Sequence, residues 1–242
     1  MVILYEPDLT EFAKLLSQDL HCDKLQLNIS QFPNGEFKID PIHLDDTPVL
    51  IIFSCFDDIN SQLMKYLLIL QNIQDAKIID VFIPYIPYSR QDKSKSFEFV
   101  LNIFRALKIR KIITIDIHKN INDKFIVNIF PHELFGEHYL HSDFIVIAPD
   151  IGAVHRAKAF AEFLNTELVI IDKVSGQTKN IEVVKGRNCL IVDDIIDTGK
   201  TIRNAKTILT AYGAKHIEYS ISSDARNNLS YFHKSISEII QN

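Results

Sequence analysis

Carboxylates, a glycine and a helix-start signal follow one apolar run, and together these residue types could bind a phosphorylated sugar. The run is 189–192, and Asp193 and Asp194 come where a buried strand should end. Residues 197–201, Asp-Thr-Gly-Lys-Thr, then open a helical pattern. The N–H groups of a helix start bind phosphate, whereas carboxylates suit sugar hydroxyls or a bridging Mg²⁺. We therefore expect a sugar-phosphate site in this segment.

The same segment has two other interpretations. The Gly-Lys-Thr at 199–201 resembles the end of an ATP-type P-loop, but that motif needs a glycine where Asp194 stands. The segment could also be an ordinary turn in which Asp197 or Thr198 caps the helix. An ordinary turn does not explain why three carboxylates converge there, so the sugar-phosphate site is favoured.

A second group of candidates follows the apolar stretch 77–86. Prolines near its end block a strand ladder, so Arg-Gln-Asp-Lys at 90–93 should lie in a loop beyond a strand end. Open α/β sheets bind ligands at that edge. Arg90 suits phosphate through its planar fork, and Lys93 suits it as a point charge. The alternative is a solvated charge run, which fits 94–96 better.

Three further positions stand at a turn or at strand ends. Pro-Asn-Gly at 33–35 is a strong turn signal, and a plain hairpin connector would explain it. His118 follows the β-branched stretch 111–117, where a metal or phosphate role and a structural role are equally favoured. Asp150 comes just after 144–148, another expected strand.

Strand and helix patterns alternate along the chain, with a break at 130–143, and predict an α/β fold of two mainly parallel sheets flanked by helices. We expect two domains, 1–138 and 139–242, with a tail helix that could pack on the first. Residues 174–180 are expected to form a mobile loop. The predicted strands are 2–5, 25–29, 49–53, 77–86, 111–117, 144–148, 167–171, 189–192 and 216–220. The helical patterns run through 9–16, 59–73, 97–107, 157–164, 201–212 and 229–240.

The composition narrows the class of protein. A net charge of −5 argues against binding nucleic acid, because no basic excess is present to neutralise phosphates. The three cysteines are widely spaced, which fits free thiols in a reducing cytoplasm. The first residues lack a signal-peptide pattern, and no apolar run is long enough for a membrane span. We expect a cytoplasmic protein without a membrane partner.

Five separate stretches point to one family. They are Phe-Pro-Asn-Gly-Glu at 32–36, Pro-Tyr-Ser-Arg-Gln-Asp-Lys at 87–93, Asp-Ile-His at 116–118, Pro-Asp-Ile-Gly at 149–152 and the loop 193–201. In this order they resemble phosphoribosyl pyrophosphate synthetase, also called ribose-phosphate diphosphokinase, over most of the chain. The resemblance implies two tandem phosphoribosyltransferase-like domains. It also implies Mg²⁺-dependent transfer of the diphosphoryl group of ATP to ribose 5-phosphate, giving phosphoribosyl pyrophosphate and AMP.

The resemblance also assigns roles by position. Ribose 5-phosphate would be held by Asp193, Asp194, Asp197, Thr198, Gly199, Lys200 and Thr201. ATP would contact Phe32, Asn34, Glu36, Arg90, Gln91, Asp92 and His118. The metal would be ligated or oriented by His118 and Asp150, and Lys173 would stabilise the transferring phosphoryl charge. In the family the 32–36 turn reaches a neighbouring subunit, which implies a homo-oligomer, a dimer or larger.

The chain departs from the family pattern in two places that affect the expected activity. Ser175 stands where the family has an arginine, two residues after the loop lysine. One cation fewer near the transition state should slow the reaction, by roughly 10²-fold or more. Family members continue with further strands and helices beyond the position of Ser222, so we expect a short second domain. Two alternatives stay open: a non-catalytic member that binds nucleotide or a true synthetase, and a phosphoribosyltransferase.

Overall fold

The chain forms two compact units, one of which contains both the beginning and the end of the chain. Unit 1 comprises residues 1–129 and 229–242, and unit 2 comprises residues 130–228. The sequence analysis divided the chain at 138/139 and placed the tail in the second domain, as a helix that could pack on the first. The computed structural model describes all residues except 55–57, 91–94, 118–122, 132–135, 137–138, 141, 172–177, 194–198 and 222–228.

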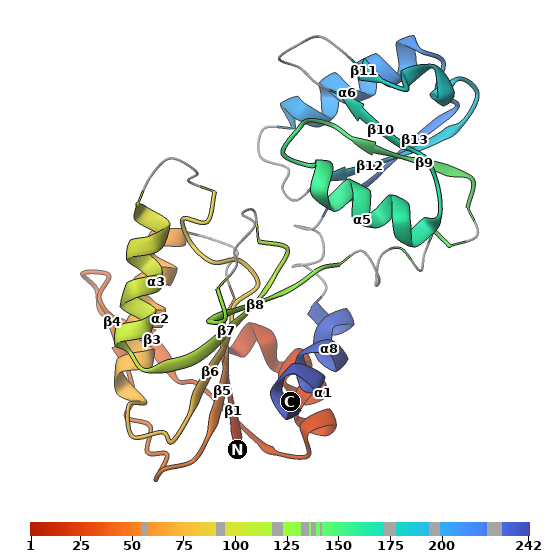
Figure 1. Cartoon of the computed structure of the whole chain (residues 1–242). Coiled ribbons are helices and arrows are strands. Elements are labelled where there is room, and N and C mark those ends of the chain that lie inside the picture. The colour runs from red at the N-terminus through yellow and green to blue at the C-terminus, as the bar shows by residue number, and fades with distance from the viewer. Residues whose placement is uncertain are drawn as a thin grey trace. The chain divides into compact units, whose positions relative to one another are not determined.

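A six-stranded parallel sheet forms the centre of unit 1, in the order β2-β1-β5-β6-β7-β8 (Figure 1). Its strands are β1 Val2–Tyr5, β2 Asp23–Gln26, β5 Val49–Ile52, β6 Ile79–Phe82, β7 Ile109–Ile115 and β8 Ile126–Ile129. Both β5 and β6 are buried throughout, as parallel strands covered by helices require. The strand order reverses between β1 and β5. Open α/β sheets bind ligands at the carboxyl ends of the strands that flank such a reversal.

Helices cover both faces of this sheet, with α2 and α3 on one face and α1 and α8 on the other (Figure 1). Their bounds are α1 Thr10–Leu20, α2 Ile59–Asn72, α3 Ser96–Ala106 and α8 His233–Gln241. Tyr66 of α2 and Phe104 of α3 are fully buried in one hydrophobic core with Ile51 of β5. Across the sheet, the ring centroids of Phe12 on α1 and Phe82 on β6 are 5.4 Å apart. Each face therefore has its own packed layer.

The tail of the chain is anchored to unit 1 through α8. A short 3₁₀ helix, η4 (Leu229–Phe232), precedes α8, which packs along α1. Nδ1 of His233 lies 2.5 Å from Oδ2 of Asp19 on α1. Lys111 of β7 donates from Nζ to the carbonyl oxygen of Ile239 at 2.6 Å, and a cation is favoured at such a helix C-terminus. Polar contacts to two elements thus hold the tail helix in place.

A separate antiparallel hairpin, β3 (Ile29–Gln31) and β4 (Phe37–Ile39), follows β2. The single strand predicted over 25–29 is wrong, because the chain leaves the main sheet within that range. Leu27 donates its N–H to the carbonyl oxygen of Tyr5 at 2.8 Å and is buried there. The chain then turns away to pair with β4, so the alternating pattern spans two different strands.

Unit 2 holds a five-stranded sheet in the order β11-β10-β9-β12-β13, parallel except for the β10–β11 pair. Its elements are β9 Phe144–Ala148, α5 Val154–Leu164, β10 Leu168–Ile171, β11 Thr178–Lys179, the 3₁₀ helix η3 Ile181–Val184, β12 Asn188–Asp193, α6 Lys200–Ala211 and β13 His216–Ile221. Alternate residues of β9 and β12 pack against α5 and against α6, so helices cover both faces. The strand order reverses between β9 and β12.

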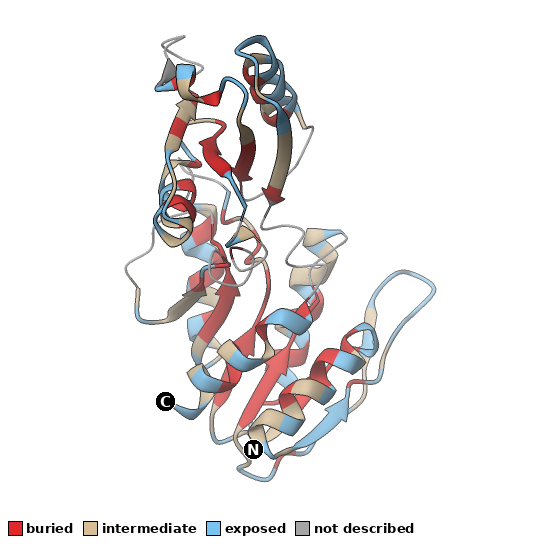
Figure 2. Ribbon diagram, turned by 90° about the vertical axis from the view of Figure 1, so that its right-hand side faces the viewer, coloured by how far each residue is buried: buried red, intermediate tan, exposed pale blue. Residues whose placement is uncertain are grey.

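In both units the central strands are the most deeply buried elements, and the helices keep one side toward solvent (Figure 2). The expected α/β architecture, two mainly parallel sheets flanked by helices, is confirmed. Among the described helices, none combines the length and the apolar character that crossing a membrane requires.

Candidate functional site

The carboxyl edge of the unit 2 sheet carries two predicted site residues. Asp193 is the last residue of β12, and Asp150 lies just beyond the neighbouring strand β9. Asp193 is 8 % exposed, and its Oδ1 lies 3.7 Å from Nη1 of Arg156 on α5. A nearly buried carboxylate is costly unless its charge is compensated. Arg156, which the sequence analysis did not single out, supplies that compensation at the strand end.

Gly199 and α6 form the other part of this edge. Gly199 has a φ of +68° and stands directly before Lys200, the first residue of α6. Because glycine adopts this left-handed conformation without a steric penalty, the chain can turn sharply into the helix. The first turn, with Lys200 and Thr201, has N–H groups and a helix dipole that favour an anion. The alternative that Asp197 or Thr198 caps α6 is wrong, because the N-cap is Gly199.

Asp150 is the predicted metal-site residue that the structure describes. It is half-buried, and its Oδ1 accepts a hydrogen bond from the N–H of Ala153 at 3.2 Å. Within the described residues, no three His, Cys, Asp or Glu side chains come together as a metal cluster. Mg²⁺ is often held by one or two carboxylates together with substrate phosphates and waters. One carboxylate at a strand end fits that mode better than a cage built from protein ligands.

The β3–β4 hairpin turn presents the predicted residues 32–36. The N–H of Gly35 donates to the carbonyl oxygen of Phe32 at 2.8 Å, and the N–H of Phe32 donates to that of Glu36 at 2.9 Å. Asn34 accepts a hydrogen bond from the N–H of Glu36 at 3.2 Å, so it serves the hairpin connector. The turn geometry does not require an aromatic residue at position 32. Phe32 nevertheless stands there, and it is 49 % exposed at this tip. An exposed ring there suits contact with a ligand or with another chain.

The loop after β6 brings Arg90 to the surface. The strand predicted over 77–86 is shorter than expected and ends at Phe82, because the prolines beyond it cannot donate to a ladder. Tyr88 has a φ of +66°, and its hydroxyl donates to Oδ1 of Asn60 at 2.6 Å. This bond ties the loop that carries Arg90 to α2.

Several predicted site residues lie outside the described part of the chain, and their roles stay predictions. Ser175 and residues 174–177 of the expected mobile loop 174–180 lie there as well. For residues 178–179 the expected loop is wrong, because they form β11 and pair with β10. The site residues concerned are Gln91, Asp92, Lys93, His118, Lys173, Asp194, Asp197 and Thr198.

Glu6 and Lys65 form a buried ion pair at the carboxyl edge of the unit 1 sheet, and the sequence analysis missed it. Glu6 directly follows β1, Lys65 lies on α2, and the residues are 4 % and 7 % exposed. Nζ of Lys65 donates to Oε2 of Glu6, and the N–H of Ser54, beyond β5, donates to Oε1 at 3.3 Å. Burial raises the pKa of Glu6 above its ordinary 4.5, against the opposing effect of Lys65. The available signal was a carboxylate directly after a buried strand, the same signal that marked Asp150.

A cavity of about 320 Å³ lies beside this ion pair, between the end of β1 and the base of the hairpin. It is lined by Glu6, Pro7, Ile29, Ser30, Gln31, Phe37 and Lys65. The two charges in its wall bind each other, so the cavity offers a ligand little uncompensated charge.

Two family models match the chain in succession. The first, the N-terminal domain of ribose phosphate pyrophosphokinase, matches residues 1–103. The second, the phosphoribosyl transferase domain, matches residues 116–227. The second match includes Asp193 and Gly199, and the first includes the 32–36 turn and Arg90.

Relatives of this chain match it over most of their own length. A ribose-phosphate pyrophosphokinase of Granulibacter bethesdensis is 34 % identical over 226 residues, which cover 84 % of this chain and 73 % of the relative. One of Methanobrevibacter smithii is 30 % identical over 240 residues, covering 86 % of this chain and 80 % of the relative. Ribose-phosphate pyrophosphokinase 1 of Streptococcus pneumoniae is 27 % identical over 250 residues, with coverage of 90 % and 78 %.

A solved structure shows the same fold. The crystal structure of phosphoribosylpyrophosphate synthetase from Mycobacterium smegmatis matches with a TM-score of 0.78 and 26 % identity, over 90 % of this chain and 79 % of that one. The fold, the two successive family models and the identity to relatives over most of their length agree. The chain belongs to the ribose-phosphate pyrophosphokinase family.

Proposed function

We propose that this member of the family transfers the diphosphoryl group of ATP to ribose 5-phosphate, giving phosphoribosyl pyrophosphate and AMP. The carboxyl edge of the unit 2 sheet carries the proposal. There Asp193 ends β12, and Gly199 and the start of α6 come later along the chain, in the order that a sugar-phosphate site requires. The relatives named ribose-phosphate pyrophosphokinase, which match most of the chain, support the same activity.

Ribose 5-phosphate binds, in this proposal, at the loop between β12 and α6. The 5-phosphate accepts hydrogen bonds from the N–H groups of 197–201, where the positive end of the α6 dipole favours a dianion. Asp193 and Asp194 accept hydrogen bonds from the ring hydroxyls. Arg156, at 3.7 Å from Asp193, compensates that carboxylate and positions it for the sugar.

ATP binds through residues of unit 1. Phe32 stacks on the base, and Arg90 pairs with the phosphates through its planar guanidinium. Mg²⁺ would be held at Asp150 and His118 together with the substrate phosphates, and it would neutralise the charge of the diphosphoryl group. The remaining ATP contacts assigned to the chain are Asn34, Glu36, Gln91, Asp92 and His118.

Lys173 is the catalytic residue in this proposal. Phosphoryl transfer depends on positioning and on cations around the equatorial oxygens, and a lysine ammonium beside them stabilises the developing charge. Ser175 cannot supply the second cation that an arginine would give. The serine at position 175 therefore supports a second candidate function: the chain would be a non-catalytic member of the family that binds nucleotide or a true synthetase.

The chain acts as a homo-oligomer in this proposal. The exposed ring of Phe32 stands at the tip of a hairpin that belongs to neither main sheet. A tip of this kind can contact the nucleotide site of a neighbouring copy.

An assay for AMP tests the activity. The purified full chain is incubated with ATP and Mg²⁺, with and without ribose 5-phosphate, and AMP release is expected only when the sugar is present. Lys173→Ala should lower the rate by roughly 10²-fold. Lys185→Ala, at an exposed lysine just after η3, serves as the matched control and should keep the wild-type rate.

The assay also separates the alternatives. No AMP with ribose 5-phosphate, across divalent metals and pH, would overturn the synthetase activity. Calorimetric binding of ATP in that case would favour the non-catalytic member. Consumption of phosphoribosyl pyrophosphate in the presence of purine or pyrimidine bases would favour a phosphoribosyltransferase.

A further inference from the structure

Arg156 occupies a position that is unfavourable for an arginine. It is the third residue of α5, in the first turn of the helix, where the helix dipole disfavours a positive charge. It is also 9 % exposed, and a buried charge is costly unless a partner compensates it. Apolar side chains of similar volume often stabilise a fold as well as a buried ion pair does, or better. Stability alone therefore does not explain why an arginine stands here.

Arg156 faces the carboxylate at the end of β12. Nη1 of Arg156 and Oδ1 of Asp193 are 3.7 Å apart, which is longer than a hydrogen bond between those two atoms. The two side chains are only 10 % and 11 % exposed, so water screens the attraction between their charges little. The guanidinium therefore draws the carboxylate toward α5 and restricts the directions in which it can point.

The packing around this pair keeps the two charges in place. Ala157, the next residue of α5, is buried in one hydrophobic core with Val192, the residue before Asp193. The start of α5 is tied to the end of β9 by the hydrogen bond from the N–H of Ala153 to Oδ1 of Asp150, at 3.2 Å. Since β9 and β12 are neighbours in the sheet, the backbone segments that carry the two charges are fixed relative to each other.

Different groups of the proposed site bind the two halves of ribose 5-phosphate. The phosphate meets the N–H groups at the start of α6, which would bind any phosphate ester in the same way. A carboxylate accepts hydrogen bonds from ring hydroxyls, and a charged acceptor makes the stronger hydrogen bond. The carboxylates that follow the apolar run of β12 must therefore distinguish one phosphate ester from another.

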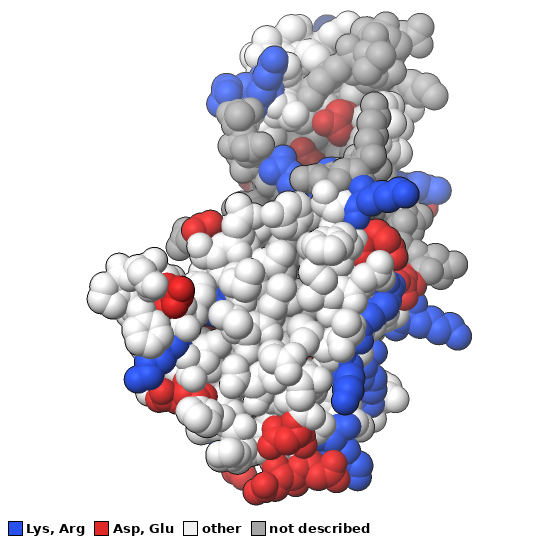
Figure 3. All heavy atoms as spheres, turned by 90° about the vertical axis from the view of Figure 1, so that its left-hand side faces the viewer, with Lys and Arg blue, Asp and Glu red and all other residues white. Residues whose placement is uncertain are grey.

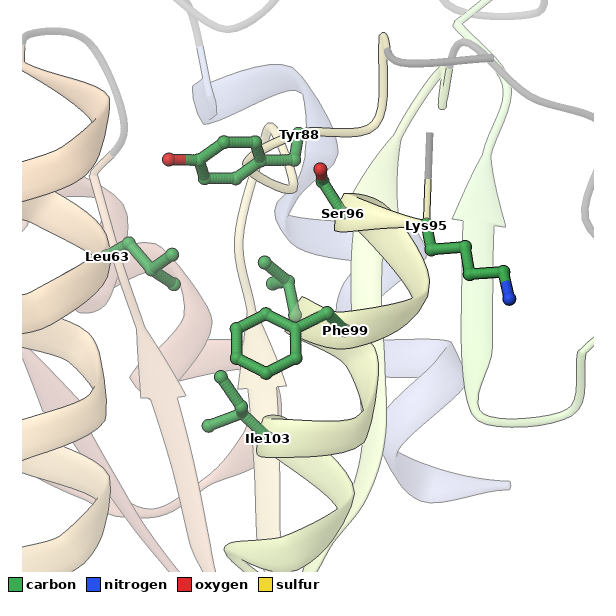
Figure 4. A pocket seen from close by; sticks show the side chains of 7 residues that line it. Leu63, Tyr88, Lys95, Ser96, Phe99 and Ile103 are labelled. Atoms are coloured by element: carbon green, nitrogen blue, oxygen red, sulfur yellow. The ribbon is translucent and has the colours of Figure 1, made fainter. Parts of the chain in front are cut away.

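Two cavities of unit 1 do not provide such recognition. In an open groove of about 460 Å³ between α2 and α3, Phe99 and Ile103 project toward Leu63, while the side chain of Lys95 points away (Figure 4). Seen from the side of these helices, unit 1 shows a broad area without Lys, Arg, Asp or Glu (Figure 3). In the cavity beside Glu6 the two charges bind each other. Neither cavity therefore offers charged groups that could select a sugar phosphate.

We infer that Arg156 is a positioning residue that makes the sugar site select its ligands by their ring hydroxyls. It acts through Asp193, because the guanidinium holds this carboxylate in the direction from which it accepts a hydrogen bond from a hydroxyl. Arg156 itself contacts no substrate. The inference rests on the proposed binding of ribose 5-phosphate after β12, and it adds how the site distinguishes this sugar from other phosphate esters. It does not depend on turnover.

Two ligands separate recognition of the sugar from recognition of the phosphate. Ribose 5-phosphate carries ring hydroxyls, whereas tetrahydrofurfuryl phosphate has a five-membered ring and a phosphate ester without any hydroxyl. Binding of each ligand to the purified full chain, with Mg²⁺ and without ATP, is followed by phosphorus NMR titration. The wild-type chain should bind ribose 5-phosphate more tightly by roughly 10-fold or more, because a site built for hydroxyls discriminates against a ligand that lacks them.

Variants of Arg156 should change only the binding of the sugar. Arg156→Met removes the cation and keeps an apolar stem, so ribose 5-phosphate should bind roughly 10-fold more weakly and tetrahydrofurfuryl phosphate as before. Arg156→Lys keeps a charge without the planar fork and should give an intermediate affinity for ribose 5-phosphate. Arg187→Met is the matched control, because Nη2 of Arg187 pairs with Oδ1 of Asp143 at 2.7 Å, at the other end of β12. It should bind both ligands as wild type does.

A combined variant tests whether Arg156 acts through Asp193. Asp193→Asn alone should weaken the binding of ribose 5-phosphate, and Arg156→Met added to it should cause no further loss, because the two residues act as one unit. The combined variant leaves no buried charge of this pair without a partner, so it should fold even where Arg156→Met alone does not. Arg156→Lys, which keeps the charge, tests the selectivity in that case.

The outcomes separate this inference from the proposed function. The inference is overturned if the Arg156 variants bind ribose 5-phosphate as wild type does, if they weaken both ligands equally, or if the losses in the combined variant add. It is also overturned if the wild-type chain binds both ligands equally. In these cases ribose 5-phosphate still binds, and the proposed function stands. A wild-type chain that does not bind ribose 5-phosphate contradicts the proposed function and the inference together.

Discussion

The carboxyl edges of the two sheets share a topology but use their charged residues differently. In unit 1 the strand order reverses between β1 and β5, and in unit 2 it reverses between β9 and β12. A carboxylate follows the first of these strands in both units, Glu6 after β1 and Asp150 after β9. Glu6 accepts a hydrogen bond from Lys65 and is only 4 % exposed, so it is not open to a ligand. Asp150 is half-buried, and the unit 2 edge continues into a glycine turn and the start of α6.

Topology provides a ligand-binding edge in both units, and the residues at the strand ends decide how that edge is used. In unit 1 the charges bind each other, so the edge gains a structural ion pair and keeps little charge for a ligand. In unit 2 Nη1 of Arg156 and Oδ1 of Asp193 are 3.7 Å apart, and a helix start of the kind that favours an anion follows. The unit 1 edge contributes to the stability of the fold, and the unit 2 edge is the proposed sugar-phosphate site.

Breaking the unit 1 ion pair should have the largest effect. Lys65→Met leaves the buried carboxylate of Glu6 without its partner, so the free energy of unfolding should fall by about 3–5 kcal/mol. Lys14→Met is the matched control, because Lys14 pairs with Glu11 at 3.8 Å on the exposed side of α1. An exposed pair of this kind contributes about 1 kcal/mol or less. Urea unfolding followed by circular dichroism measures both variants.

A double variant distinguishes the cost of an unpaired charge from a loss of packing. Glu6→Leu combined with Lys65→Met removes both charges, and its stability should lie within about 1 kcal/mol of wild type or above it. If the double variant is as unstable as Lys65→Met alone, the pair is not what stabilises this edge. The two edges would then not differ in how their charged residues are used.

The central strands could be predicted from the sequence because they are continuous aliphatic runs. The runs at 49–53, 144–148 and 189–192 correspond closely to β5, β9 and β12. β8 was not predicted, because an edge strand with three half-buried residues shows neither a continuous apolar run nor a clear alternation. Hydrophobic periodicity thus predicts the interior of a sheet better than its margins.

At the site, residues directly after strands were predictable and their partners were not. Asp150 and Asp193 follow from the strand ends alone, since parallel strands bring their carboxyl ends to one edge. Arg156 and Lys65 reach those edges from helices, so their contacts depend on how α5 and α2 pack. No local pattern distinguishes a basic residue that points inward from one that points to solvent.

The glycine turn of unit 2 should show a smaller and more specific effect. Gly199→Ala places a Cβ at a φ of +68°, which costs about 1–2 kcal/mol and strains the turn that aims the first N–H groups of α6. Binding of ribose 5-phosphate, measured by calorimetry, should weaken by roughly 10-fold. Gly186→Ala is the matched control, because Gly186 has a φ of +72° with open space around it and lies in a turn of unit 2 outside the site. It should cost similar stability and leave sugar-phosphate binding unchanged; equal binding by both variants would contradict the assigned role of the turn.

The smallest effect concerns the pH dependence of the unit 1 edge. Because burial raises the pKa of Glu6, the folded chain binds the Glu6 proton more tightly than the unfolded chain. The contribution of Glu6 to the free energy of unfolding should therefore fall as the pH rises from its ordinary pKa of 4.5 through the raised value.

Glu6→Gln cannot ionise and lacks this slope, although it loses the ion pair at every pH. Urea titrations of both chains from pH 4.5 to 7 should show the stability advantage of wild type shrinking with pH. An advantage that grows over this range would mean that Lys65 stabilises the carboxylate more than burial destabilises it, and the unit 1 edge would then resemble a charged site rather than a closed one.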